Sequence, residues 1–175
     1  MWFESLTGFK ENDGARVADR IREDGPFLES TVNGRRMQRG DFSVVSLADL
    51  RRRRDNGDPI PYVGETTVRE VVADARELHA DPEVAGATFQ VASQFNMLEM
   101  TSPKITPEAG VARYELDPTQ GPACAIACGA GTIHRNYFVP VDGGGHLVRG
   151  QTADRQLDGF ADLAADRTAA AKVAS

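Results

Sequence analysis

Residues 121–141 of the chain read GPACAIACGAGTIHRNYFVPV, and this stretch decides the fold class that the sequence predicts. Its first part, residues 121–130, joins small side chains to Pro122, and proline is favoured in the first turn of a helix. Its second part, residues 132–141, is typical of a strand, because apolar side chains alternate along it. These side chains are Ile133, Tyr137, Val139 and Val141. A helix that leads straight into a strand favours an α/β or α+β domain.

The clearest helical pattern elsewhere lies in residues 67–78. Thr67 and Glu70 have the spacing of a capping box, and the apolar side chains around them recur on one helical face. That face consists of Val68, Val71, Val72, Ala75 and Leu78. A second helix is expected over residues 46–54, where Ser46 stands at the N-cap position.

A β-hairpin is predicted near the N-terminus. Asn33-Gly34 lies between residues 28–32 and residues 35–38, and Asn-Gly supplies the positive φ angles of a type I′ turn. The remaining helices are expected over residues 12–23, 106–113 and 154–166, and the remaining strands over residues 42–45 and 87–93.

Length and composition fit one globular domain. The chain has 175 residues, of which 41% are hydrophobic and 26% are charged, and a chain of this size and composition buries one core. Interleaved helices and strands predict an α/β or α+β fold over residues 1–168, as a single layered domain with a mixed central sheet flanked by helices. Residues 169–175 are rich in alanine and lack a cap, so we expect them to form a frayed tail.

The charge balance argues against binding of nucleic acid over a broad surface. The net charge is −6 and the pI is near 5.1, whereas phosphate binding on that scale needs a basic face. An arginine run at residues 51–54 would form a basic patch with Arg35, Arg36 and Arg39; the alternative is a charged helix end that complements the helix dipole. No apolar run approaches the ~18 residues of a membrane span. Because a signal-peptide pattern is also missing, we expect a cytoplasmic protein without a membrane partner.

Cysteine and histidine spacing predicts neither a metal site nor a disulfide framework. Cys124 and Cys128 are the only cysteines, four apart in a predicted helix, and we expect both to be reduced core residues. His79, His134 and His146 do not have metal-ligand spacing. The sequence therefore implies no metal and no cofactor.

Polar side chains at two predicted junctions favour a small-molecule pocket. Gln94 and Asn96 follow a predicted strand, and Gln120 and Gly121 precede a predicted helix. Ligands of α/β folds bind beyond the carboxyl ends of strands, and the free N–H groups of a helix start attract phosphate or carboxylate. The alternative is structural: Thr119 only caps the helix, and Gly121-Pro122 only sets its turn.

Several side chains in the same segment carry reactive or ligand-binding groups. Glu99, between two apolar residues, is a candidate general acid or base, and a solvated loop position is the alternative. Cys124 near a helix start, with His134 as base, is a candidate nucleophile, and an inert buried thiol is the alternative. Arg135 and Asn136 are candidates for holding a phosphate and a ligand edge, and a cross-strand salt bridge of the arginine is the alternative.

The order of these features resembles the central part of macrodomains, nearest to the bacterial type of poly(ADP-ribose) glycohydrolase. The similar stretches are residues 91–96 (VASQFN), residues 120–122 (QGP) and residues 132–137 (TIHRNY). The resemblance implies a pocket for ADP-ribose whose walls include Asn96, Gln120 and Gly121. The chain also resembles bacterial proteins that share its start MWFE and its segment QGPACA, and this second resemblance implies no activity.

The chain departs from the macrodomain pattern at the positions that carry catalysis. The Gly-Gly-Gly loop of the family is absent after Asn96, and its two catalytic glutamates would fall on Gly121 and Pro122. If the resemblance holds, hydrolysis of an ADP-ribosyl bond would need a different carboxylate, for which Glu99 is the candidate.

The first hypothesis is therefore a macrodomain-like module that binds ADP-ribose or a related nucleotide and hydrolyses an ADP-ribosyl bond with Glu99. Its expected ligand-binding residues are Gln94, Asn96, Gln120, Gly121, Cys124, Arg135 and Asn136. One alternative is a non-enzymatic interaction or assembly domain. The other is a cysteine-dependent enzyme that uses Cys124 and His134.

Overall fold

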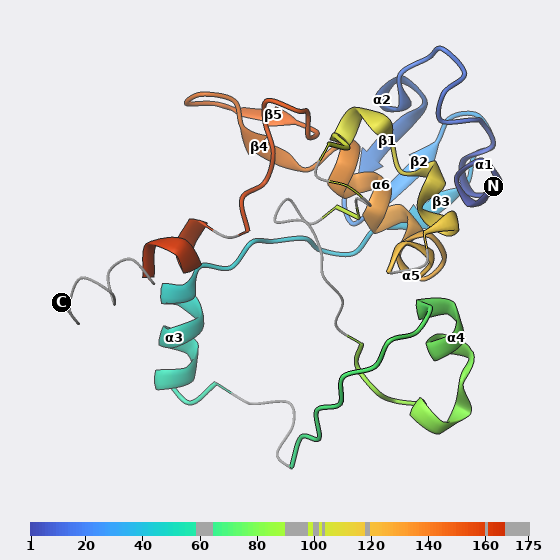
Figure 1. Cartoon of the computed structure of the whole chain (residues 1–175). Helices are drawn as coiled ribbons and strands as arrows, with labels where there is room; N and C mark the ends of the chain where they lie inside the picture. The colour runs from blue at the N-terminus through green and yellow to red at the C-terminus, as the bar shows by residue number, and fades with distance from the viewer. Residues whose placement is uncertain are drawn as a thin grey trace. The chain divides into compact units, whose positions relative to one another are not determined.

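The described part of the chain is a mixture of helices and small antiparallel sheets, which makes the fold class α+β. The structure is a computed structural model (Figure 1). It describes residues 1–58, 65–89, 98–99, 102, 104–117, 120–159 and 161–166. Backbone contacts divide the chain into two compact units. Unit 1 comprises Met1–Phe42 and Ala73–Leu157, and unit 2 comprises Ser43–Val72 and Asp158–Ser175. The expectation of one domain over residues 1–168 stays a prediction.

The first sheet contains the predicted hairpin. Its strands are β1 (Ile21–Asp24), β2 (Phe27–Ser30) and β3 (Arg36–Gln38), in the order β1-β2-β3. Leu28 of β2 pairs with Met37 of β3, so both side chains reach the buried face of the sheet. The turn is longer than predicted. Ser30 N donates a hydrogen bond to Arg35 O at 3.0 Å, and four residues lie between this pair. Gly34 has φ 70°, the positive value for which glycine is suited.

The strand predicted over residues 132–141 is wrong, because most of it is a helix. Helix α5 (Gly121–Ile126), predicted from its proline, is followed by α6 (Gly129–Tyr137). Ile133 and Tyr137 are four residues apart, which fits one face of a helix as well as one face of a strand. The helical alternative lets both side chains contact the core, where Ile133 is fully buried. Extended structure begins only at β4 (Pro140–Asp142).

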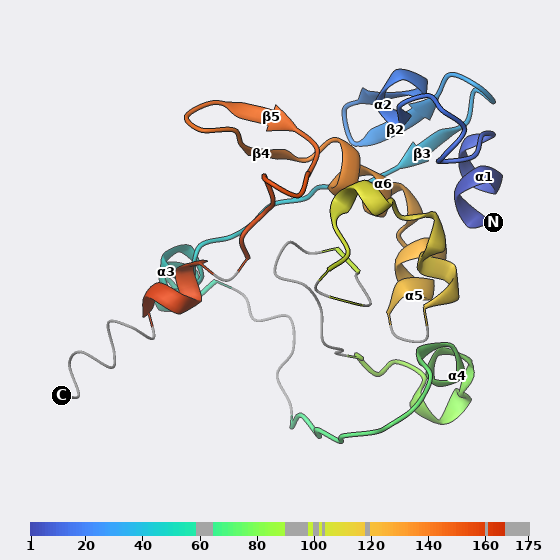
Figure 2. The same ribbon diagram turned by 45° about the horizontal axis from the view of Figure 1, so that its top comes forward.

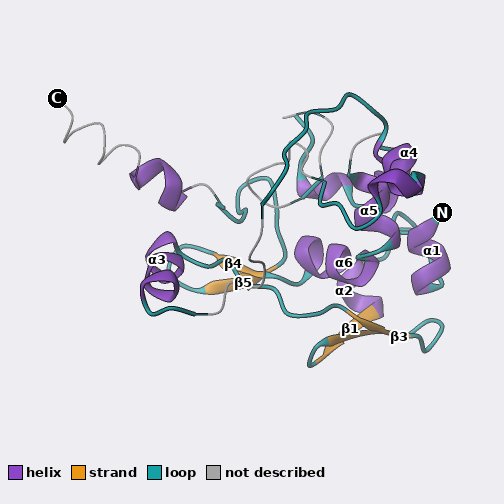
Figure 3. Ribbon diagram, turned by 90° about the horizontal axis from the view of Figure 1, so that it is seen from below, coloured by secondary structure: helices purple, strands orange, loops and turns teal. Residues whose placement is uncertain are grey.

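The second sheet is a two-stranded hairpin. β4 pairs with β5 (Leu147–Arg149) in antiparallel register. Between them lies the predicted glycine turn, in which the Asp142 carboxylate accepts hydrogen bonds from Gly144 N and Gly145 N. Figure 3 shows the strands confined to these two small sheets. The described strands therefore do not form the mixed central sheet that the sequence predicts.

Short helices complete unit 1. They are α1 (Trp2–Thr7), α2 (Val17–Arg20), α4 (Ala75–Ala80) and the 3-10 helices η1 (Pro82–Val84), η2 (Pro107–Ala109) and η3 (Ala112–Leu116). The helix predicted over residues 12–23 shrinks to α2, because Ile21 already begins a strand. The helix predicted over residues 106–113 begins at the expected proline but breaks at Gly110, which has φ 78°. Residues 87–89 form no strand, and residues 90–93 lie outside the described residues.

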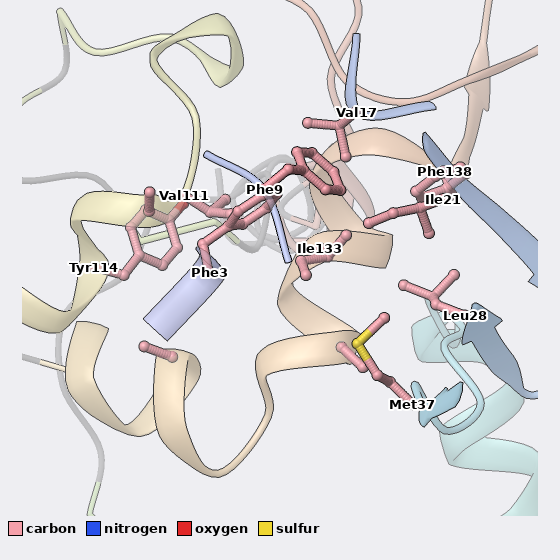
Figure 4. Packing of buried hydrophobic residues seen from close by; sticks show 13 residues of the cluster. Phe3, Phe9, Val17, Ile21, Leu28, Met37, Val111, Tyr114, Ile133 and Phe138 are labelled. Atoms are coloured by element: carbon pink, nitrogen blue, oxygen red, sulfur yellow. The ribbon is translucent and has the colours of Figure 1, made fainter. Parts of the chain in front are cut away.

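The core of unit 1 lies where α1, α6, η3 and the first sheet meet (Figure 4). Phe3 of α1 packs edge-on against Phe9, with ring centroids 5.5 Å apart. Val111 and Ile133 join them from distant parts of the chain, and both are fully buried. Helix α6 packs on β2 and β3 (Figure 2). The sheet therefore supports the helix that carries His134 and Arg135.

Unit 2 contains the helix predicted from its N-cap. Helix α3 (Leu47–Asp55) follows Ser46, whose hydroxyl accepts a hydrogen bond from Asp49 N at 3.1 Å. Residues 161–166 are helical, which confirms the end of the helix predicted over residues 154–166, but residues 154–159 are not helical, so its first part is wrong. An ion pair at 2.9 Å joins Arg51 to Asp166. Residues 42–45 form no strand.

The helix predicted over residues 67–78 is wrong for most of its length. Residues 65–74 are not helical, and the helix that follows, α4, is capped by Asp74, which accepts a hydrogen bond from Arg76 N at 2.8 Å. Val68 is 89% exposed and Val72 is 102% exposed. An isolated helix of this length is marginal unless an apolar face is buried. Nothing described in unit 2 buries these valines, so the capping box alone does not hold a helix.

Candidate functional site

A cavity of about 570 Å³ lies in unit 1 beside α5 and α6. This size falls within the range of about 300–1,000 Å³ that is typical of ligand pockets. Its polar and aromatic lining side chains include Arg39, Asp41, Phe42, His79, Phe89, Gln120, Cys124, Cys128, His134 and Arg135. Small residues of α5, together with Gly131, line the rest of the wall near the helices. The lining of the cavity therefore contains both basic groups and aromatic rings.

Arg39 brings an unsatisfied donor to the cavity. Its Nη1 donates to the Gly40 carbonyl at 2.8 Å. Its Nε is buried and has no hydrogen-bond acceptor among the residues that the structure describes. Burying a guanidinium donor without an acceptor costs about 1–3 kcal/mol or more. An acceptor supplied by a ligand would recover that cost.

Arg135 is held in the wall by its neighbours on α5 and α6. Its Nη2 donates to Thr132 Oγ1 at 3.2 Å and to Cys124 Sγ at 3.8 Å. The Thr132 hydroxyl in turn donates to the Cys124 carbonyl at 3.0 Å, which ties the two helices together. The guanidinium group is therefore positioned before any ligand enters.

His134 is a buried base whose surroundings disfavour its protonated form. Its Nε2 lies 3.4 Å from Glu23 Oε1, and Glu23 also pairs with Arg149 at 2.9 Å. Burial lowers the pKa of His134, and the positive charges of Arg39 and Arg135 lower it further, against the opposing effect of Glu23. Burial is the largest cause of the lowered pKa, and the guanidinium charges of Arg39 and Arg135 near His134 would also attract an anion.

The two cysteines differ in exposure. Cys124 is half-buried beside Arg135, and burial raises the pKa of its thiol despite the arginine. A thiol with a raised pKa is mostly protonated at neutral pH, so Cys124 is a weak nucleophile towards a substrate from solution. Cys128 is exposed, so the expectation that both are core residues is wrong for Cys128. Its position at the break between α5 and α6 takes it off the packed face of the helix.

The structure brings three of the predicted ligand-binding residues together, along with His134, the predicted base for Cys124. Gln120, Cys124 and Arg135 line the cavity. These residues come together although the predicted strand is absent, because the adjacent helices α5 and α6 carry Cys124 and Arg135. Gln94 and Asn96 lie outside the described residues, so their place in the site stays a prediction.

Two predicted residues have a packing role instead. A Cβ at Gly121 would lie 2.3 Å from the Tyr114 carbonyl oxygen, so the close approach of η3 to α5 requires glycine there. Asn136 is buried on α6, and its Nδ2 donates to the Pro107 carbonyl at 3.1 Å. Neither residue belongs to the described lining of the cavity.

Glu99, the predicted acid or base, is buried but does not lie on the described wall of the cavity. It is close to Tyr114 and Cys124, where its charge adds to the effect of burial in raising both pKa values. Asp41 is the carboxylate that the described part of the wall presents. Sequence reasoning did not single out Asp41, because an aspartate in a loop carries no pattern.

The sequence does not predict the part of the lining that comes from outside α5 and α6. Arg39 was noticed only as part of a basic patch, and Phe42 was placed in a strand. His79 and Phe89 make an edge-to-face contact, with ring centroids 5.1 Å apart. The one sequence signal for this wall was the arginine cluster that ends at Arg39.

Comparison with known protein families, with curated proteins and with solved structures finds no match to this chain. Within the described residues, no helix is both long and apolar enough to cross a membrane. The described part of the chain also holds no group of three or more His, Cys, Asp or Glu side chains arranged to bind a metal ion.

Proposed function

We propose that the cavity of unit 1 binds ADP-ribose or a related nucleotide through its phosphates. The observation that carries the proposal is the buried Nε of Arg39, which has no acceptor among the described residues and lines the same cavity as Arg135 and His134. Arginine side chains bind phosphate through several parallel hydrogen bonds. Phosphate oxygens between Arg39 and Arg135 would accept a hydrogen bond from the buried Nε of Arg39. They would also be attracted by the positive charges of the two guanidinium groups.

The rest of the wall supports a nucleotide rather than a bare anion. Phe42, Phe89 and His79 present aromatic rings on the same cavity, and such rings stack on or pack against a purine. The carboxylate of Asp41 accepts hydrogen bonds, as a ribose hydroxyl requires. The cavity volume of about 570 Å³ is of the size class that takes such a ligand.

The proposal rests on the cavity and not on the macrodomain fold. The described strands are antiparallel, so the mixed sheet implied by the macrodomain resemblance gives it no support. Hydrolysis of an ADP-ribosyl bond by Glu99 is a separate prediction. Glu99→Gln should stop turnover and leave affinity unchanged, whereas unchanged turnover would remove Glu99 from that role. A cytoplasmic location is part of the proposal, as the setting in which such nucleotides occur.

The direct test is a thermal-shift screen, followed by calorimetry, of the whole chain with ADP-ribose, NAD, AMP and ADP, each with and without EDTA. A ligand that binds only the folded state raises the melting temperature. We expect ADP-ribose to raise it equally with and without EDTA. No shift with any of the four compounds would overturn the proposal and favour the assembly domain or the cysteine-dependent enzyme.

Matched variants locate the site. Arg39→Gln should weaken ADP-ribose binding about tenfold or more, because hydrogen bonds to charged groups are strong. Arg113→Gln is the control, since Arg113 is an exposed arginine of the same unit and does not line the cavity. Equal affinities of the two variants would place the ligand elsewhere on the chain.

A further inference from the structure

Both cysteines of the chain lie in the wall of one cavity, at the junction of two helices. Cys124 is part of α5, and Cys128 occupies the N-cap position of α6. Both side chains line the cavity, and both thiols are free. Cys128 is exposed and Cys124 is half-buried, so a soluble reagent meets Cys128 first.

The two thiols are near neighbours, because both line the same cavity and Cys128 contributes to the raised pKa of Cys124. Side chains four apart on a helix have Cβ atoms about 5–6 Å apart, and a disulfide needs about 3.5–4.5 Å. Helix α5 ends at Ile126, and Cys128 has φ −126° and ψ 30°, outside the helical region. Cys128 therefore stands at a break in the helical backbone, where its carbonyl accepts a hydrogen bond from Thr132 N at 2.8 Å while its φ and ψ differ from those of a helix.

We propose that Cys128 is an oxidation site for hydroperoxides, resolved by Cys124 into a disulfide in the cavity wall. The Cys128 thiolate attacks the peroxide, the O–O bond breaks, and the products are a sulfenic acid and an alcohol or water, which takes up the thiol proton. Cys124 then loses its proton and its sulfur attacks the Cys128 sulfur. The S–O bond breaks and hydroxide leaves, taking that proton to form water. Two thiols have lost two electrons to one peroxide.

The disulfide alters the wall that holds Arg135. Cys124 Sγ accepts a hydrogen bond from Arg135 Nη2 at 3.8 Å, and closing the disulfide draws that sulfur towards Cys128. Arg135 loses one of the contacts that position it. This consequence rests on the proposed nucleotide site, in which Arg135 binds phosphate. Oxidation is then expected to weaken ADP-ribose binding about two- to tenfold, as loss of one hydrogen bond does.

The test treats the reduced chain with hydrogen peroxide and measures the intact mass under non-reducing conditions. We expect a monomer that has lost two hydrogens and regains them with a reductant. In Cys124→Ser, the sulfenic acid on Cys128 should persist and be trapped by dimedone. In Cys128→Ser, the same dose should give no adduct on the half-buried Cys124. Melting curves of each variant establish that it is folded.

Other outcomes overturn the proposal. A disulfide between two chains, or dimedone labelling of Cys124 before Cys128, would remove the assigned roles. A disulfide that leaves ADP-ribose affinity unchanged would remove the effect on the site. Absence of ADP-ribose binding in both redox states, with the disulfide formed, would overturn the proposed function alone, because the mass measurement does not depend on the ligand.

Discussion

The hydroxyl of Tyr137 donates a hydrogen bond to the Glu11 carboxylate at 2.7 Å, between residues far apart in the chain. The same carboxylate accepts hydrogen bonds from Val111 N and Ala112 N, both at 2.8 Å. Glu11 is buried and thereby joins the N-terminal segment to the start of η3 and to the end of α6. A single side chain thus fixes the helix that presents His134 to the cavity.

Replacing this carboxylate is expected to destabilise unit 1. Glu11→Gln replaces an acceptor of three charge-assisted hydrogen bonds with a neutral amide, whose N–H group cannot accept one. We expect the free energy of unfolding to fall by about 1.5–3 kcal/mol, measured by urea denaturation. Glu4→Gln, an exposed position on α1, is the control and should change stability by less than about 0.5 kcal/mol. Equal effects of the two changes would show that the Glu11 contacts contribute nothing specific.

A second comparison tests which apolar side chains hold the fold. Ile133→Ala empties a fully buried position on α6, so we expect a loss of about 2–5 kcal/mol. Val72→Ala removes a fully exposed side chain and should cost less than about 0.5 kcal/mol. Both are read from the midpoint and slope of urea denaturation. A large loss of stability in Val72→Ala would contradict the exposure of this side chain and would support the helix predicted over residues 67–78.

The elements that the sequence predicts correctly are those whose cause is local. Gly34 supports a turn, Ser46 caps α3, and Pro122 lies in the first turn of α5, each acting on residues a few positions away. The sequence does not predict helix α6, because the four-residue spacing of Ile133 and Tyr137 fits one face of a helix as well as one face of a strand. Contacts of α6 with the sheet and with the distant Glu11 favour the helix, and a local sequence pattern cannot predict such contacts.

The same distinction between local and long-range causes applies to the residues of the site. Gln120, Cys124 and Arg135 were predicted because they lie close together in one segment. Arg39 and Phe42 belong to the same cavity but come from a segment far away in the sequence. Only the packing of α6 on β2 and β3 brings the two segments together. A single sequence does not specify that packing, so the contribution of Arg39 and Phe42 to the cavity could not be predicted from it.

Stability is expected to depend on pH through His134. Burial and the charge of Arg39 lower its pKa in the folded state below the unfolded value of about 6.5. Below that pH the unfolded chain takes up the proton more readily than the folded chain. The contribution to stability is therefore complete above about pH 6.5 and is lost as the pH falls through the lower, folded pKa. His134→Gln should flatten the stability profile between pH 7.5 and 5, whereas His146→Gln, at an exposed position, should keep the wild-type slope.

A bound phosphate reverses this effect at the same side chain. An anion beside His134 favours the protonated imidazole, so binding raises its pKa and the complex takes up a proton. By linkage, affinity for ADP-ribose should increase as the pH falls from 7.5 to 6, before the nucleotide phosphates themselves are protonated. Calorimetry in two buffers of different ionisation enthalpy measures the proton uptake directly. His134→Gln should abolish most of the uptake, and uptake equal to that of the wild type would place the phosphates away from His134.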